Sequence, residues 1–175
     1  MNQYNIKKIV TICPHCFNTI RNEYPQFGGD YEVLHYSQFV DALINKGDIK
    51  PIKMIDATVA YHDSCYLGRH NGVYDEPRNV ARSIPGLKLV EIGSRCRERG
   101  FCCGAGGGHM WIEESQGDRI NHVRPDQFLE TEADTVGVSC PFCLQMLTEG
   151  IQSKGQADSK QSKDVLELLA DSLGD

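Results

Sequence analysis

The sequence lacks most features that mark a membrane, secreted or nucleic-acid-binding protein. No stretch of its 175 residues stays apolar over the roughly 20 positions that a membrane-spanning helix needs. The first residues, MNQYNIKKIVTI, lack the small-residue cleavage site of a secretory signal. Lysine and arginine (18) are fewer than aspartate and glutamate (24), the formal net charge is −6, and no basic block occurs. We therefore expect a cytoplasmic protein that does not bind nucleic acid and is free to dock peripherally on a membrane complex.

Cysteine is abundant instead, with eight residues in the chain. In a small secreted protein, eight cysteines would indicate a disulfide framework, but that interpretation needs an oxidising compartment and a signal sequence. In a reducing compartment, clustered cysteines more often bind metal. With 40% hydrophobic residues, the chain can bury a core, and it fits one ordinary domain or one domain with part of another.

Short β-branched segments alternate with segments of helical periodicity. Strands are predicted at 6–12, which is expected to be buried, and at 32–36, 58–63, 88–92 and 135–139. Helices are predicted at 17–24, 37–46 with Ser37 as its cap, 77–84, 109–114, 119–132 with Pro125 as a candidate break, 144–151 and 164–173. Residues 153–162 are polar and predict a mobile linker. The alternation predicts an α/β fold with a parallel sheet, whose ligands gather beyond the carboxyl ends of the strands.

The most unusual stretch is FCCGAGGG at 101–108, which places two adjacent cysteines before a run of small residues. A single cysteine precedes this pair and a CxxC motif follows it, with 36 residues between them in each case. Five thiols are one more than a tetrahedral zinc ion or a cubane cluster takes. Adjacent cysteines suit two different metal ions or one bridging thiolate, so the pattern favours a polynuclear centre. The five are Cys65, Cys102, Cys103, Cys140 and Cys143.

The glycines of this stretch have two interpretations. Gly104 and Gly106 are predicted to let backbone amides approach the cysteine sulfurs, where hydrogen bonds tune a metal centre. A phosphate-binding turn is the alternative for GAGGG, but a GxGxxG turn needs a strand directly before it and an acidic residue about 20 positions later.

Two segments repeat the same sequence of strand, CPxC motif and amphipathic helix. VTICPHCFNTIRNE at 10–23 and VSCPFCLQMLTEG at 138–150 place their cysteines 127 residues apart. At this offset, counterparts of the other three motif cysteines would fall before residue 1. We therefore expect residues 1–55 to be the C-terminal part of a first domain whose front half is missing, 56–152 a complete domain, and 153–175 a polar linker with a terminal helix. The alternative is a complete small protein with a structural CxxC near its start.

The segments YHDSCYLGRH, FCCGAGGGHMW and SCPFC, in this order and spacing, resemble the CCG domain. This is the cysteine-rich domain found in heterodisulfide reductase, and it also occurs in iron–sulfur subunits of glycolate oxidase and lactate utilisation systems. The resemblance covers residues 57–150 and implies a Rossmann-like parallel fold. Residues 6–45 resemble the end of a preceding CCG domain.

The resemblance also implies a noncubane [4Fe-4S] cluster held by all five cysteines of the motif, Cys65, Cys102, Cys103, Cys140 and Cys143. Family members usually carry two such motifs, whereas this sequence has one and a fragment, in which Cys13 and Cys16 would form an incomplete second site. The implied function is that of an iron–sulfur subunit that passes electrons to a disulfide, or between a flavoprotein and a quinone or other carrier. The implied partners are other oxidoreductase subunits, either a flavoprotein or a ferredoxin-like iron–sulfur subunit.

Two other functions are compatible with the cysteines. A structural zinc module would use Cys140 and Cys143 with two further thiols, although the two CxxC pairs lie far from zinc-ribbon spacing. A thiol–disulfide oxidoreductase would use Cys13 as a nucleophile at a helix N-terminus, which leaves most of the other cysteines unexplained.

A few residues near the cysteine loops have no assigned role in this pattern. Cys96 fits none of the five positions and is predicted to be a bystander thiol. His62, His70 and His109 are either packed or surface side chains, or groups that donate to a cluster or relay protons. Trp111 is predicted to pack in the core or in an interface.

Overall fold

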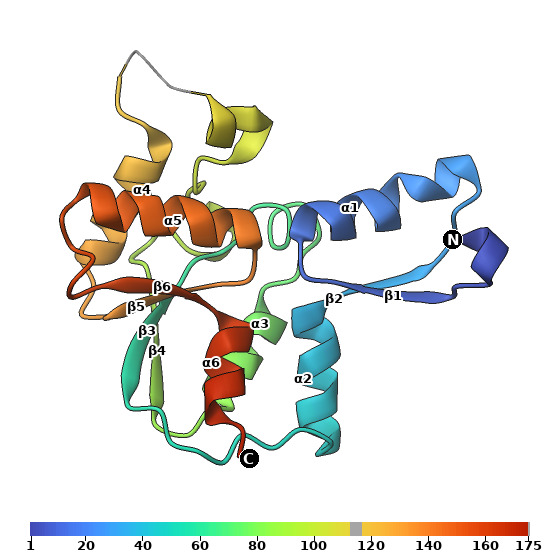
Figure 1. Cartoon of the computed structure of the whole chain (residues 1–175), viewed down its shortest axis with the longest axis horizontal. Coiled ribbons are helices and arrows are strands. Elements are labelled where there is room, and N and C mark those ends of the chain that lie inside the picture. Colours follow the sequence, from blue (N-terminus) through green and yellow to red (C-terminus); the bar gives the residue numbers. More distant parts are fainter. Residues whose placement is uncertain (113–116, 175) are drawn as a thin grey trace.

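Two parallel sheets form the frame of the molecule (Figure 1). The computed structural model describes residues 1–112 and 117–174. Strands β1 (Lys8–Thr11) and β2 (Glu32–His35) form a two-stranded sheet. The four-stranded sheet has the order β4-β3-β5-β6 and consists of β3 (Ala57–Tyr61), β4 (Leu87–Glu91), β5 (Thr135–Val138) and β6 (Gln161–Asp164). All paired strands are parallel, which confirms the predicted α/β class.

The order of the four-stranded sheet reverses between β3 and β5. The chain passes from β3 outward to β4, returns across β3 to β5, and continues outward to β6. At such a switch point the connections leave the central strands in opposite directions, so a crevice forms beyond the carboxyl ends of those strands. Cys65 lies in the loop after β3, Cys140 lies between β5 and α5, and Cys143 lies in the first turn of α5.

Helices cover both faces of this sheet. On one face, α4 (Ile120–Leu129) and α5 (Pro141–Ser153) share a core with Ala60 of β3 and with Val136 and Val138 of β5. On the other face, α2 (Tyr36–Lys46), α3 (Asp75–Arg82) and α6 (Val165–Ser172) lie side by side and form a second core with Val59 and Tyr61 (Figure 1). Alternate residues of β3 thus enter opposite cores, as in a strand that is covered on both faces.

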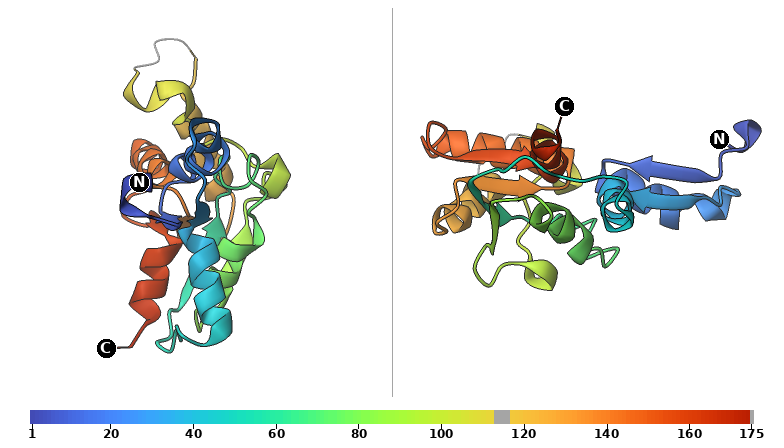
Figure 2. Two further views of the ribbon diagram at one scale, coloured as in Figure 1. Left: turned by 90° about the vertical axis from the view of Figure 1, so that its right-hand side faces the viewer. Right: turned by 90° about the horizontal axis from the view of Figure 1, so that it is seen from below.

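The N-terminal sheet projects from one side of the molecule, away from the four-stranded sheet (Figures 1 and 2). Helix α1 (Pro14–Asn22) packs on it through a small core that joins Phe17 and Val33 to the loop residues Leu67 and Val73. Helix α2 packs against α3 in the second core of the main sheet. Residues 1–55 therefore contact the rest of the chain through both of their helices.

The internal repeat extends beyond the segment seen in the sequence. Elements β1, α1, β2 and α2 follow one another with the same parallel pairing as β5, α5, β6 and α6. In each copy a CPxC motif begins the first helix. In each copy, too, a residue with a capping box ends the second strand and begins the second helix, His35 in one and Asp164 in the other. The repeat covers residues 8–46 and 135–172.

Strand β1 is not buried as its β-branched sequence predicts. Its residues alternate between exposed and partly buried, and Val10 is 43% exposed. Strand β5, by contrast, is buried at all four positions. The difference follows from pairing, because β5 lies between β3 and β6, whereas in the described part of the chain β1 pairs with β2 alone.

The structure also corrects several local predictions. His35, and not Ser37, caps α2, and its side chain accepts a hydrogen bond from the Ser37 amide. Strand β6 overlaps the end of the segment predicted as a polar linker, 153–162, because residues 161–164 pair with β5. Pro125 lies inside α4 without ending it. Instead of a helix at 109–114, the chain forms the 3-10 helix Gly106–Trp111, and residues 113–116 lie outside the described ranges.

The described residues also form short 3-10 helices at Asn2–Tyr4, before β1, and at Tyr24–Phe27 and Arg97–Arg99. Among the helices of the described ranges, none is both long enough and apolar enough to cross a membrane.

Candidate metal centre

Five cysteines come together beyond the carboxyl ends of β3, β4 and β5. Cys65 lies in the turn after β3, and Cys102 and Cys103 lie in the loop after β4. Cys140 is the N-cap of α5, and Cys143 lies in the first turn of that helix. The structure thus brings to one edge of the sheet the five thiols that the sequence analysis grouped.

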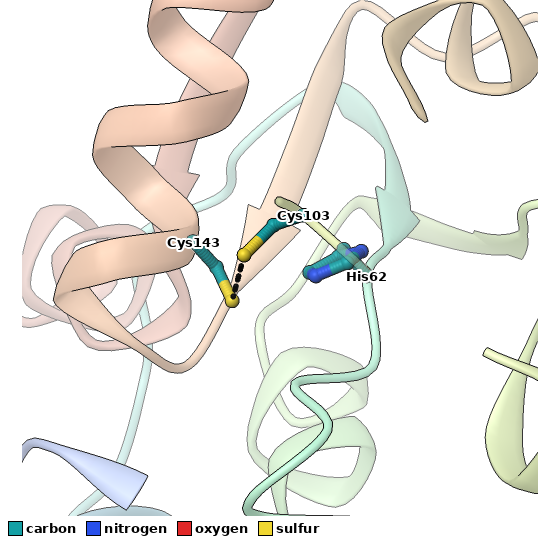
Figure 3. A group of neighbouring side chains, drawn as sticks. All are labelled: His62, Cys103 and Cys143. Carbon is teal, nitrogen blue, oxygen red and sulfur yellow. Dashed lines mark hydrogen bonds between the residues drawn. The ribbon is translucent and has the colours of Figure 1, made fainter. Parts of the chain in front are cut away.

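These thiols form a continuous series of neighbours. The Sγ atoms of Cys143 and Cys103 lie 3.3 Å apart (Figure 3). Cys103 interacts with Cys102, and Cys102 in turn with Cys65. At the other end of the series Cys143 interacts with Cys140. Three members are buried and two, Cys65 and Cys102, are partly exposed, so the series runs from the core to the surface.

Hydrogen bonds make Cys102 the acidic member of the outer part of the series. Cys103 and Cys65 donate to its sulfur and lower the pKa of Cys102 well below the ordinary value of a thiol, against the opposing effect of burial. The Gly104 amide also donates to this sulfur, at 3.3 Å. As donors to Cys102, Cys65 has a raised pKa and Cys103 has a pKa of about 12. A thiolate is therefore favoured at Cys102, between Cys65 and Cys103.

Cys140 is the second acidic thiol. A hydrogen bond from Cys143 lowers the pKa of Cys140 to about 5, with further hydrogen bonds from His15 and from the first backbone amides of α5, whereas burial opposes the shift. The unpaired amides and the dipole of a helix N-terminus favour negative charge at this position. Two thiolates in one partly buried pocket make the site suitable for cations.

The structure requires glycine at position 104 but not at position 106. Gly104 has φ +96°, and a Cβ there would lie 3.0 Å from the backbone nitrogen of Asn121, so only glycine fits without a shift. A Cβ at Gly106 would meet nothing within 4 Å. Gly106 instead lines a hollow of about 240 Å³ beside the thiols, together with His15, Tyr66, Gly107, Trp111 and Phe142 among others.

A buried ion-pair network holds the loop that carries Cys65. Arg78 is fully buried and donates to both carboxylate oxygens of Asp63, at 2.7 and 2.8 Å, and to Glu91 at the end of β4. Asp63 also accepts a hydrogen bond from the backbone amide of Arg97, at 2.6 Å. Bidentate guanidinium–carboxylate pairs fix orientation as well as distance. Asp63 therefore ties the Cys65 loop to the loop that leads to the adjacent cysteines.

His62 is buried at the same edge of the sheet. Its ring faces Cys103 and Cys143, and the possible ligand atoms of the three residues lie within 4.8 Å of one another (Figure 3). Arg124 Nε donates to His62 Nδ1 at 3.1 Å. Burial, together with the charge of Arg124, lowers the pKa of His62 to about 3, so the ring is neutral at pH 7.

The N-terminal CxxC pair lies beside the series of five thiols. Cys13 is the N-cap of α1 and Cys16 is exposed. The Nδ1 of His15 lies 3.7 Å from Cys13 Sγ, and hydrogen bonds to Cys13 and to Cys140 raise the pKa of His15 to about 9. Burial opposes a thiolate at Cys13, but the hydrogen bonds from His15 and from backbone amides lower the pKa of Cys13. The sequence analysis missed this link, although a histidine inside a CPxC motif was its visible signal.

The residues present fit an iron–sulfur group. A set of sulfur donors is what soft metal ions and iron–sulfur clusters prefer. Two buried atoms at this edge, His62 Nε2 and Ser64 Oγ, have no hydrogen-bond partner within residues 1–112 and 117–174. Buried polar atoms without a partner are rare and costly. A group with sulfur acceptors would supply partners for both.

The remaining residues singled out in the sequence lie around the series. Cys96 Sγ lies 3.6 Å from the carbonyl of Gly93, in the loop after β4. His70 is exposed, and its ring stacks on Tyr66. Trp111 is 74% exposed and meets Phe142 edge to face, so it does not lie in the core. His109 lies in the 3-10 helix that follows the adjacent cysteines.

Comparison with known proteins places this geometry in a family. The sequence profile of the CCG family, described as a cysteine-rich domain, matches residues 59–148. EtfAB:quinone oxidoreductase of Syntrophomonas wolfei is 46% identical over 175 residues, which cover 96% of this chain and 24% of that protein. The probable iron–sulfur-binding oxidoreductase FadF of Bacillus subtilis is 47% identical over 169 residues, with 97% and 24% covered. One of the subunits of the dihydromethanophenazine:CoB–CoM heterodisulfide reductase of Methanosarcina acetivorans is 39% identical over 170 residues, with 95% and 41% covered.

The chain spans about a quarter of the length of the first two relatives and about two fifths of the third. The match to the family profile covers more than half of the chain and includes all five cysteines of the series. The resemblance found in the sequence is therefore confirmed, and this chain belongs to the CCG cysteine-rich domain family.

Proposed function

We propose that the chain is an iron–sulfur subunit, or part of one, in a heterodisulfide reductase-like oxidoreductase, and that it transfers electrons through a noncubane [4Fe-4S] cluster. The observation that carries this proposal is the unbroken series of five neighbouring thiols. A tetrahedral zinc ion or a cubane cluster would leave one of the five without a metal. The names of the relatives, which include a quinone oxidoreductase and an iron–sulfur-binding oxidoreductase, support the same activity.

The residues of this chain would have different roles at the site. The proposed ligands are Cys65, Cys102, Cys103, Cys140 and Cys143. When bound, an iron–sulfur cluster accepts and releases single electrons. Gly104 presents its amide to the Cys102 sulfur, and Asp63, held by Arg78, fixes the approach of the Cys65 loop. The buried positions of Cys103 and Cys143 keep water from the inner part of the site.

We further propose that residues 1–55 correspond to the end of a first CCG-like domain. The supporting observation is that β1, α1, β2 and α2 repeat the order and pairing of β5, α5, β6 and α6. Cys13 and Cys16 would then belong to a second site that needs three thiols from outside this chain. The partially exposed end of the thiol series would face a flavoprotein or ferredoxin-like partner, in the cytoplasm or on a peripheral membrane complex.

Each of the two alternative functions is supported by one specific observation. The contacts of Cys143 with Cys103 and Cys140 are compatible with a zinc ion held by thiols. The lowered pKa of Cys13 beside the exposed Cys16 is compatible with thiol–disulfide exchange at the CPHC motif. Neither alternative uses all five thiols of the series.

Anaerobic reconstitution with iron and sulfide tests the proposal. The chain should take up an iron–sulfur cluster, show its visible charge-transfer absorption, and lose that absorption reversibly on reduction. Cys103→Ser should remove the cluster, whereas Cys96→Ser should retain it. A wild-type protein that stays colourless under these conditions, or that holds one zinc ion without sulfide, contradicts the proposal.

A further inference from the structure

His62 is a buried histidine with one occupied and one free ring nitrogen. It directly follows β3, is 1% exposed, and points its ring at Cys103 and Cys143 (Figure 3). Nδ1 is engaged by Arg124, and Nε2 has no hydrogen-bond partner in the described ranges. Figure 3 shows one ring nitrogen on the side of the two sulfurs and the other turned away from them. Because Arg124 holds Nδ1, we assign the unengaged Nε2 to the side of the thiols, where the proposed cluster would sit.

Arg124 determines which nitrogen of His62 carries the proton. A guanidinium group has only donors, so the Nδ1 that receives Arg124 Nε–H must present a lone pair. In a neutral imidazole the proton is then on Nε2. Arg124 is itself fully buried and is held by two more hydrogen bonds, to Gln127 Oε1 at 2.6 Å and to the carbonyl of Arg95 at 3.1 Å. With its other nitrogens held, the guanidinium keeps its Nε–H directed at His62.

This arrangement is the reverse of the one around a metal-binding histidine. A histidine ligand donates from its second nitrogen to a carboxylate or carbonyl, which leaves a lone pair on the nitrogen that binds the metal. Here the second nitrogen accepts from a donor, so the nitrogen near the thiols carries hydrogen. Moving that proton to Nδ1 would place two N–H groups against each other inside the core. The short distances among His62, Cys103 and Cys143 therefore do not make His62 a ligand.

We propose that His62 donates a hydrogen bond from Nε2–H to a sulfur of the bound iron–sulfur group, and that Arg124 is the positioning residue that fixes the required tautomer. The inference rests on the proposed function, because it needs a cluster in the site. Hydrogen bonds to cluster or cysteine sulfur stabilise the reduced state, which carries more negative charge. His62 therefore raises the reduction potential of the cluster, and its hydrogen-bond partner would be a sulfide or a thiolate sulfur of that cluster.

The test is a reductive titration of the reconstituted full chain, followed by visible absorption, together with iron and sulfide analysis. His62→Leu removes the donor and should keep the iron and sulfide content of the wild type while the midpoint potential falls. His62→Gln keeps an amide donor on a longer side chain, and its midpoint potential should fall less than that of His62→Leu. His70→Leu, at an exposed histidine near the same loops, is the matched control and should leave the potential unchanged.

Pulsed EPR of the reduced wild-type protein, with histidine labelled by ¹⁵N, requires no variant and covers the case in which a variant fails to fold. A hydrogen-bonded His62 should give a weak nitrogen coupling that disappears in His62→Gln, and a direct ligand would give a strong one. A strong coupling, or loss of iron from His62→Leu as complete as from Cys103→Ser, overturns the inference in favour of ligation. An unchanged potential in His62→Leu also overturns it. Failure of the wild type to bind any cluster would instead refute the proposed function.

Discussion

The two copies of the strand–CPxC–helix–strand–helix unit differ in their surroundings more than in their own structure. In the C-terminal copy, β5 lies between two strands, and Cys140 and Cys143 are buried among thiols from two other loops. In the N-terminal copy, the one strand that pairs with β1 within the described ranges is β2, and Cys16 is exposed. The shared motif alone therefore supplies two sulfurs at a helix N-terminus. The neighbouring loops after β3 and β4 are what turn the pair into a candidate five-thiol site.

The first prediction compares equivalent cysteines in the two copies. Cys143 and Cys16 both occupy the second cysteine position of a CPxC motif. Cys143→Ser should lose most of the iron of the reconstituted protein, because its thiol joins the two halves of the series. Cys16→Ser should retain wild-type iron. Equal losses, measured by iron analysis after anaerobic reconstitution, would show that the two motifs contribute alike.

The second prediction concerns equivalent positions of the two copies, one in the last turn of α5 and one directly after α1. A Cβ at Gly150 of α5 would lie 2.1 Å from the backbone oxygen of Asn121, because α4 packs directly on this position. Gly150→Ala should lower the free energy of unfolding by about 3 to 4 kcal/mol. Glu23, the corresponding residue after α1, is exposed, and Glu23→Ala should cost less than about 0.5 kcal/mol. Urea unfolding of both variants makes the comparison, and similar costs would contradict it.

The third prediction uses the caps of the second helix in each copy, which respond to pH in opposite directions. Burial lowers the pKa of His35 to about 4, so its contribution to stability is lost as the pH falls from about 6.5 to 4. Burial raises the pKa of Asp164 to about 6, against hydrogen bonds from Tyr36 and Leu166, so its contribution is lost as the pH rises from about 4 through 6. Each contribution amounts to at most about 3 kcal/mol.

Asparagine at either position keeps a capping side chain but removes the titration. Between pH 7 and pH 5, His35→Asn should lose less stability than the wild type, and Asp164→Asn should lose more. Urea unfolding at the two pH values measures the difference. The same pH response in both variants would mean that the two caps do not titrate as their burial indicates.

The fourth and smallest prediction compares a valine from each of the two equivalent strands. Val138 of β5 is fully buried, and Val138→Ala should cost about 2 kcal/mol of unfolding free energy. Val10 of β1 is 43% exposed, and Val10→Ala should cost less than about 0.5 kcal/mol. A large loss of stability from Val10→Ala would indicate that another chain or a second copy covers β1 in solution.

The strands and helices could be predicted largely from local patterns. Two of the exceptions depend on neighbouring strands, and the third depends on the position of a turn. Strand β6 has the sequence QSKD, which carries no hydrophobic alternation, and it forms because β5 offers an edge to pair with. The exposure of β1 depends on which strands lie beside it, and that information is absent from its β-branched residues. His35 replaces Ser37 as the cap because the turn from β2 into α2 occurs two residues earlier than the serine suggested.

The candidate site could also be predicted only in part from the sequence. The order and spacing of the cysteines were enough to group the five thiols, because parallel strands bring their following loops to one edge. The contacts of His15 with Cys140 and of Arg124 with His62 join elements more than 60 residues apart and follow no local rule. Only the contact between the first turns of α1 and α5, where His15 meets Phe142, and the position of α4 on the main sheet reveal them.

The central claim is that the five thiols serve one polynuclear centre. Iron, zinc and acid-labile sulfide, measured together in one anaerobically purified and reconstituted sample, test it most directly. The account predicts about four irons per chain with a matching amount of sulfide and no zinc. One zinc ion per chain without sulfide would contradict it.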